Sequence, residues 1–175
     1  MRYAFLADIH GNLEALTSVL ADIDGVGAER VVCLGDVVGY GAEPRECLDL
    51  LRQEEIPILA GNHDLAVCNR LSTQYFHSEA QASVRWTQDV LREEDRTFLA
   101  GLSLIGESEL FMAAHGTLYR PEMFEYILSV FDAQLSFEAF EAPFGFVGHS
   151  HVPAVFVQSE DRIEILMQPE MAISE

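Results

Sequence analysis

Five short apolar segments, spread over most of the chain, are each followed at once by aspartate, histidine, asparagine or glycine. Apolar runs of four or five residues bounded by glycine or polar residues are typical of buried strands. Amphipathic stretches lie between the early runs and carry leucine, valine and isoleucine at helical spacing. This alternation predicts an α/β protein whose sheet is largely parallel at its start. The expected strands are 3–7, 30–34, 56–60, 110–114 and 144–147.

The helices expected from the same periodicity are 12–23, 46–52 and 78–91. Two weaker helices are expected after Pro121 and around Phe137, where phenylalanine and tyrosine suit either kind of element. The residues 154–157 and 162–167, separated by a polar turn, predict an antiparallel hairpin. The chain has no internal repeat, low-complexity tract or linker rich in proline or serine. We therefore expect a single domain over residues 1–175.

The charge of the chain limits its partners. Twenty-nine acidic and ten basic residues give a net charge of −19, and such a surface repels phosphate backbones. Nucleic acid is therefore not an expected partner, apart from short nucleotides. No apolar run is long enough for a membrane span, so no membrane association is expected. The three cysteines form no CxxC pair, which favours a reducing, cytoplasmic environment.

The polar clusters after the strands contain groups that bind metals. In sheets of this kind ligands collect outside the carboxyl ends of the strands, so the clusters are expected to converge on one crevice. Side chains two apart in extended backbone point the same way, which would let Asp8 act with His10 and His149 with His151. A set of carboxylate, imidazole and amide ligands without thiolate suits two divalent ions such as manganese, iron, nickel or zinc. Paired ions about 3.5–4 Å apart clamp a phosphoryl group in two-metal sites.

The ordered series DIHGN, GDVVGYG, GNHD, HG and GHSH closely resembles the calcineurin-like metallophosphoesterases. Within that family it is similar to the small bacterial and archaeal phosphoesterases related to diadenosine tetraphosphatases. The matching motifs run from Asp8 to His151. The resemblance implies a four-layer α/β/β/α sandwich. This branch usually continues beyond the hairpin, so the C-terminal sheet is expected to be shortened, and a second copy in a homodimer could cover the exposed edge.

The resemblance also implies a role for each matching residue. His63 would stand over the substrate as a general acid, with Asp64 fixing the orientation of its ring and keeping it protonated. The residues expected to bind metal are Asp8, His10 and His151 for the first ion, Asp36 for both ions, and Asn62, His115 and His149 for the second.

The implied function is a metal-dependent phosphoesterase acting on phosphate mono- or diesters. A hydroxide shared by the two ions would attack phosphorus, and the general acid would protonate the leaving group, typically worth about 10²–10⁴-fold. Manganese is the favoured metal, with iron, nickel, zinc and magnesium as alternatives. The alternative function is that of a non-catalytic metal-binding scaffold with the same fold. A nuclease would share the site but fits poorly with the acidic surface.

Simpler roles are open to the single residues. Asp8 or Asp36 could cap a helix, and Asn62 could be an ordinary turn residue. For His77, which lies outside the clusters, a cap or surface position is the better interpretation. Arg120 is more simply a surface arginine than a contact to a substrate phosphate.

Overall fold

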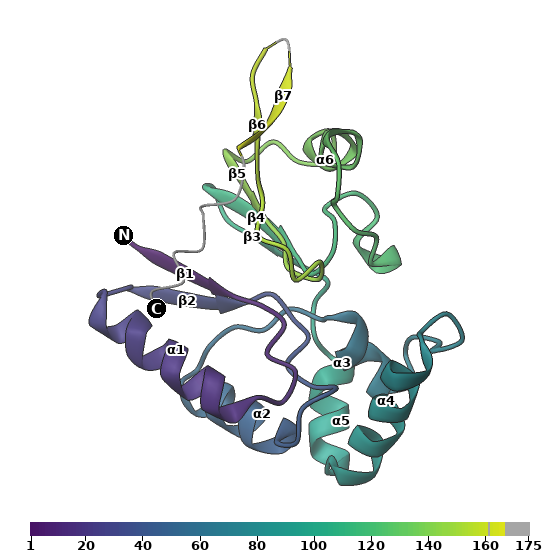
Figure 1. The fold of residues 1–175 in the computed structure, drawn as a ribbon. Helices are drawn as coiled ribbons and strands as arrows, with labels where there is room; N and C mark the ends of the chain where they lie inside the picture. The colour runs from purple at the N-terminus through teal and green to yellow at the C-terminus, as the bar shows by residue number, and fades with distance from the viewer. Residues whose placement is uncertain (161, 167–175) are drawn as a thin grey trace, which may run out of the picture.

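The computed structural model of the chain describes residues 1–160 and 162–166 (Figure 1). Its first sheet consists of two parallel strands, β1 (Tyr3–Leu6) and β2 (Arg30–Cys33), joined by helix α1 (Leu13–Gly25). The helix begins where Asn12 accepts a hydrogen bond from the backbone N–H of Ala15 at 3.0 Å, a common way to satisfy a free N–H at a helix start. These three elements confirm the predicted strand–helix–strand unit.

The next predicted strand, 56–60, lies beside β2 but is paired only through isolated bridges. Ile58 pairs with Cys33 on one side, and Leu59 pairs with Ser103 on the other. Proline at position 57 has no N–H to give to a ladder, which limits regular pairing. The segment therefore extends the sheet in position without forming a full strand, and helix α2 (Pro44–Gln53) precedes it as expected.

Three helices follow in a group, and two of them were not predicted. Helix α4 (Ser78–Val90) matches the expectation, whereas α3 (Asn62–Val67) and α5 (Glu93–Ala100) are additional. In α5 the carboxylate of Asp95 accepts the backbone N–H of Arg92 at 3.1 Å, so the helix start is held by its own first turn.

The second sheet has three strands, β3 (Ile105–Glu107), β4 (Phe111–Ala114) and β5 (Phe144–Phe146). Strand β4 runs antiparallel to β3 and parallel to β5. The three-residue β3 was not predicted, because so short a segment has no readable period.

The C-terminal part supplies a short 3-10 helix η1 (Pro121–Met123), helix α6 (Val130–Phe137) and a hairpin of β6 (Val155–Gln158) and β7 (Ile163–Leu166). The two weaker helix predictions and the hairpin are thus confirmed. The predicted end of the hairpin at position 167 lies outside the described residues.

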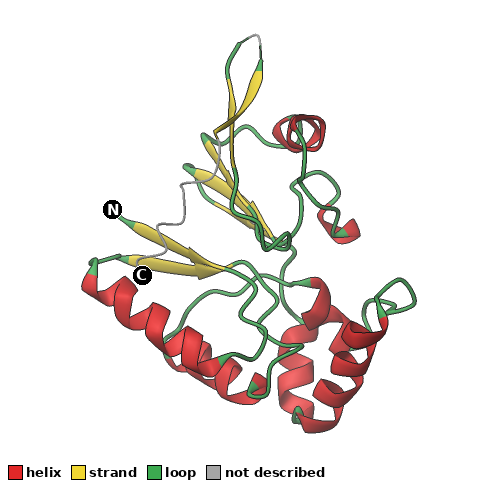
Figure 2. Ribbon diagram, in the orientation of Figure 1, coloured by secondary structure: helices red, strands yellow, loops and turns green. Residues whose placement is uncertain are grey.

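The layers are clear in the ribbon views. Helices α1 and α2 cover the outer face of the first sheet, the second sheet lies opposite its inner face, and α6 lies beside the second sheet and the hairpin (Figures 1 and 2). This is the mixed α/β architecture that was expected, built from small sheets. Among the described residues, none of the helices combines the length and the apolar character needed to cross a membrane.

Two apolar cores hold the layers together. The larger lies between the helices and the first sheet and includes Leu48 and Leu51, both fully buried. The smaller is aromatic and lies between the two sheets, where the rings of Phe5 and Phe146 stack at 3.8 Å and Phe111 meets Phe5 edge-on at 5.1 Å. Each sheet is thus fixed against a neighbour, and the loops at the strand ends meet between the sheets.

Replacement of Leu48 by alanine is expected to lower the free energy of unfolding by about 2–5 kcal/mol, because a buried side chain is lost and a cavity remains. Urea denaturation measures the change. The matched control is Leu110→Ala, whose side chain is half exposed and whose loss should cost no more than about 0.5 kcal/mol. Equal losses in the two variants would contradict the placement of the core.

Candidate metal centre

The loops after the strands turn sharply at the residues that were expected to bind metal. Asp8, His10 and Asp36 have φ values of 56°, 49° and 53°, and His149 and His151 have 67° and 54°. A left-handed backbone at a residue other than glycine costs of the order of 1–3 kcal/mol and clusters at functional sites. The expectation of extended backbone at positions 8–10 and 149–151 is therefore wrong, although the side chains do meet.

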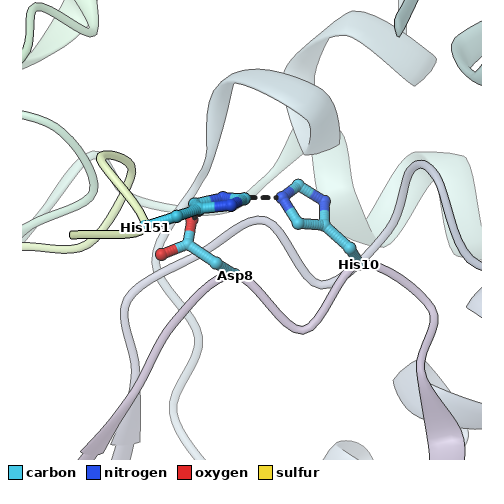
Figure 3. A group of neighbouring side chains, drawn as sticks. All are labelled: Asp8, His10 and His151. Carbon is cyan, nitrogen blue, oxygen red and sulfur yellow. Dashed lines mark hydrogen bonds and ion pairs between the residues drawn. The ribbon is translucent and has the colours of Figure 1, made fainter. Parts of the chain in front are cut away.

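One group of candidate ligands joins the two ends of the chain. Asp8, His10 and His151 offer one ligand atom each, and these atoms lie within 4.8 Å of one another. The Nε2 atoms of the two histidines are 3.2 Å apart, and Nε2 of His151 is 3.4 Å from Oδ1 of Asp8 (Figure 3). Nδ1 of His10 is 3.1 Å from the carbonyl oxygen of Val38, which leaves Nε2 directed at the group.

A second group lies deeper. Asp36, His115 and His149 also bring their ligand atoms within 4.8 Å of one another. Nδ1 of His115 is 3.0 Å from the carbonyl oxygen of Leu34, and its Nε2 is 3.3 Å from Oδ2 of Asp36. A hydrogen bond from one ring nitrogen fixes the direction of the other, as is usual for histidines that bind metals.

The two groups adjoin each other at Asp36. Its Oδ2 atom is 3.7 Å from Nε2 of His10, while Nε2 of His115 lies 3.8 Å from Oδ1 of Asp8. The backbone N–H of His149 donates to Oδ2 of Asp8 at 3.0 Å. The structure thus brings residues from both ends of the chain to one place, where Asp36 of the second group adjoins the first group. His149 and His151 lie in different groups, in line with the ligand sets that the resemblance implied.

Two buried polar atoms fit an ion. Among the described residues, Oδ1 of Asn62 and Nε2 of His115 are shielded from solvent and make no hydrogen bond, and the only charged groups within 4 Å of Nε2 of His115 are the carboxylates of Asp36 and Asp8. Leaving such an atom unsatisfied costs about 1–3 kcal/mol, and a cation would satisfy both. Oxygen and imidazole donors without thiolate suit divalent ions such as manganese or zinc. The residues present therefore fit the metals that the sequence implied.

His63 lies in the wall of the same cleft, which encloses about 240 Å³. Its backbone N–H donates to Oδ1 of Asp36 at 2.8 Å, and its ring is 5.0 Å from that of His10. Gly39, with φ of 90°, runs so close to the ring that a Cβ atom there would lie 2.5 Å from Nδ1 of His63. The ring is therefore held by packing, and Nδ1 has no hydrogen-bond partner in the part of the chain that the structure describes.

Asp64 does not have the role expected of it. Its two oxygens accept the backbone N–H groups of Asp36, Val37, Val38 and Gly61, at 2.8–3.2 Å, and none of its hydrogen bonds reaches His63. The expected orienting contact is therefore wrong. The physical reason is local: His63 and Asp64 are neighbours in the first turn of α3 and point to different sides, so the buried carboxylate faces the N–H groups of the loop after β2.

Burial sets the charge of two histidines. Desolvation lowers the pKa of His63 to about 4 and that of His149 to about 4. In the protein without metal or substrate, desolvation therefore favours the neutral form of His63. Asp64 itself has its pKa raised by burial and by the charge of Asp36 to about 7, against the four N–H donors, which lower it.

Asp36 and His115 form an ion pair. Burial opposes the charge on both, but their mutual attraction prevails: it raises the pKa of His115 to about 9 and holds the pKa of Asp36 well below its usual range. The site therefore favours a positive charge beside the carboxylate of Asp36.

Three residues of the cleft were not singled out from the sequence. Tyr40, Tyr126 and Ser150 line it together with the candidate ligands. Tyr40 belongs to the GDVVGYG motif, which could have pointed to it, whereas Tyr126 has no local motif. His77 is a cap, as the simpler interpretation held, because its Nδ1 accepts the N–H of Ala80 at 3.3 Å. Arg120 does not line the cleft.

The fold and the matching motifs have counterparts among known proteins. Residues 1–167 match the calcineurin-like phosphoesterase superfamily domain. An uncharacterized protein of Methanocaldococcus jannaschii is 37% identical over 177 residues, which cover 98% of this chain and 70% of that protein. The crystal structure of a metallophosphoesterase from Sphaerobacter thermophilus is 38% identical with a TM-score of 0.75, over 90% of this chain and 63% of that one.

A hypothetical protein from Pyrococcus horikoshii has the same fold, with a TM-score of 0.66 at 19% identity over 78% of this chain and 64% of its own. The fold is thus that of the metallophosphoesterases. The chain belongs to the calcineurin-like phosphoesterase superfamily, which confirms the resemblance seen in its motifs. It spans less than two thirds of both solved chains. The single domain, the homodimer and the cytoplasmic location stay predictions.

Substitution of Asp64 by asparagine is expected to destabilise the whole protein. The amide NH₂ would face backbone N–H donors and leave some unsatisfied, at about 1–3 kcal/mol each. Chemical denaturation should show a loss of several kcal/mol, whereas the exposed Asp89→Asn control should show almost none. An Asp64→Asn protein of unchanged stability would refute the loop-holding role.

The stability of the chelator-treated protein is expected to peak near pH 6.5. His63 and His149 bind protons less tightly when folded, so their contributions to stability rise as the pH increases from about 4 to 6.5, and the raised pKa of Asp64, about 7, offsets part of this rise. His115 binds its proton more tightly when folded, so its contribution is complete below 6.5 and is lost as the pH rises through about 9. Urea denaturation at a series of pH values measures this curve. In His115→Gln the fall above pH 7 should be absent.

Proposed function

We propose that this protein is a phosphoesterase that hydrolyses phosphate mono- or diesters with two bound divalent ions. The observation that carries the proposal is the pair of ligand groups that adjoin at Asp36, one with Asp8, His10 and His151 and one with His115 and His149. Membership of the calcineurin-like phosphoesterase superfamily supports the same activity.

The ions would activate a water for attack on phosphorus and neutralise the phosphoryl oxygens. Asp8, His10 and His151 would hold one ion, Asn62, His115 and His149 the other, and Asp36 both. An ion beside Asp36 would also displace the proton from His115, because a histidine must be neutral to bind metal. Manganese remains the favoured metal, since the donors are oxygen and imidazole.

His63 would serve as the general acid. Its ring is buried, and among the described residues its Nδ1 atom has no hydrogen-bond partner. Desolvation lowers its pKa to about 4, which favours the neutral form in the free protein. A phosphate ester in the cleft brings negative charge close to the ring, which raises the pKa of an imidazole. His63 could then take up a proton and pass it to the leaving alkoxide. Packing against Gly39 and the ring of Tyr40, 4.6 Å away, would keep it in place.

The scaffold reading is less well supported, because every candidate ligand and the acid histidine are present and lie together. A nuclease acting on long polymers is disfavoured by the net charge of −19.

Replacement of His63 by alanine is expected to lower kcat by about 10²–10⁴-fold and to leave the metal content nearly unchanged. Asp36→Ala should instead lose the metals, because both groups depend on its carboxylate. Hydrolysis of bis-p-nitrophenyl phosphate with added manganese measures activity, and elemental analysis measures occupancy.

The matched control is Asp22→Ala, an exposed aspartate on α1 that should change neither quantity. Full metal occupancy in the Asp36 variant would disprove its role between the ions. An unmodified protein that binds manganese yet releases no nitrophenol would favour the scaffold.

A further inference from the structure

The cleft has an aromatic wall on the side of His149. The ring of Tyr126 lies parallel to that of His149, with centroids 4.0 Å apart and planes 13° apart. Half of the tyrosine is exposed, at 51%, although it lines the cleft. One face of the ring is thus used by a candidate metal ligand, and the remaining surface is open at the mouth of the cleft.

A second tyrosine stands on the side of His63. The ring of Tyr40 is 4.6 Å from that of His63 and 4.8 Å, edge-on, from that of His10. Its hydroxyl lies 3.3 Å from Nε2 of His77, whose Nδ1 is 3.1 Å from a carboxylate oxygen of Glu79. This chain of contacts fixes the tyrosine, which remains 44% exposed. Both walls of the mouth are therefore rigid aromatic surfaces.

The cleft is poor in positive charge. The ten basic residues of the chain are all arginines, and none of them lines it. The residues outside the described part, 161 and 167–175, include no arginine or lysine in the sequence. Glu79, next to His77, adds a carboxylate near the mouth. Beyond the ions, no arginine or lysine among the residues that line the cleft would pair with a second anionic group of a substrate.

We propose that the cleft selects esters of a single phosphate that carry a flat aromatic group, and that it discriminates against ligands with additional negative charge. The inference rests on the proposed function and names its substrate class. Tyrosine rings gain by offset or edge-on contact with another ring, and stacking on an aromatic side chain tolerates many ring structures. A further anionic group would meet an acidic surface without a counter-charge.

Binding of three phosphonates to the manganese-loaded chain tests this without hydrolysis. Phenylphosphonate and methylphosphonate carry the same charged group, and 4-carboxyphenylphosphonate adds one carboxylate at the far end of the ring. By isothermal titration calorimetry we expect phenylphosphonate to bind about tenfold more tightly than methylphosphonate, within the range found for stacking on one aromatic side chain. The carboxylated compound should bind several-fold more weakly than phenylphosphonate.

Variants assign the preference to the tyrosines. In Tyr126→Leu and in Tyr40→Leu the ratio of the two affinities should fall towards one, while Tyr126→Phe keeps it. A loosened His149 would weaken both ligands equally and leave the ratio unchanged. The control is Tyr75→Leu, which removes a tyrosine that is 89% exposed and outside the cleft.

Equal affinity for phenyl- and methylphosphonate would overturn the inference, as would a ratio that survives both leucine variants or tighter binding of the carboxylated compound. If bis-p-nitrophenyl phosphate were still hydrolysed in that case, the proposed function would hold and only the inference about the substrate class would fail. If no phosphonate bound and no ester were hydrolysed, both would fail.

Discussion

The carboxylate of Asp64 is the contact on which the site depends. It accepts four backbone N–H groups, three from the loop after β2 and one from Gly61. It thus ties the loop after β2 to the start of α3, with 26 to 28 positions between Asp64 and the loop residues. Hydrogen bonds to a charged group are worth about 1.5–3 kcal/mol each. Because Asp36 belongs to that loop and accepts the N–H of His63, the proposed bridging ligand and the proposed acid are positioned by the same buried carboxyl group.

Much of the fold could be predicted from periodicity. Strands β1, β2 and β4 and helices α1, α2 and α4 are long enough to show an apolar run or an amphipathic face, and the three-residue β5 lies within the apolar run 144–147. Helices α3 and α5 were missed for a different reason. Each is one or two turns long and has an aspartate as its third residue, which accepts the backbone N–H of the residue just before the helix. Local capping therefore outweighs any pattern of apolar residues.

The identities of the site residues could be predicted from the sequence, but the directions in which their side chains point could not. Alternation along a strand fails where Asp8, His10 and Asp36 adopt left-handed backbone, since such a turn sends side chains out of the pleat. The partners of Asp64 are backbone N–H groups, which nearly every residue has, so no residue type in the sequence points to them. Tyr126 reaches His149 from a loop of irregular structure, and only the folded chain reveals that contact.

The first group of ligands closes the longest contact in the site, between Asp8 and His151, which stand 143 positions apart. Loops of this size are entropically expensive to close, and contacts between distant residues form slowly. The centre would consequently be completed late in folding, after both sheets have assembled. A metal that binds there binds only the folded protein, so by mass action it shifts the equilibrium away from partly folded forms. Metal binding would therefore stabilise the chain only after the loop that follows β5 has packed against the loop that follows β1.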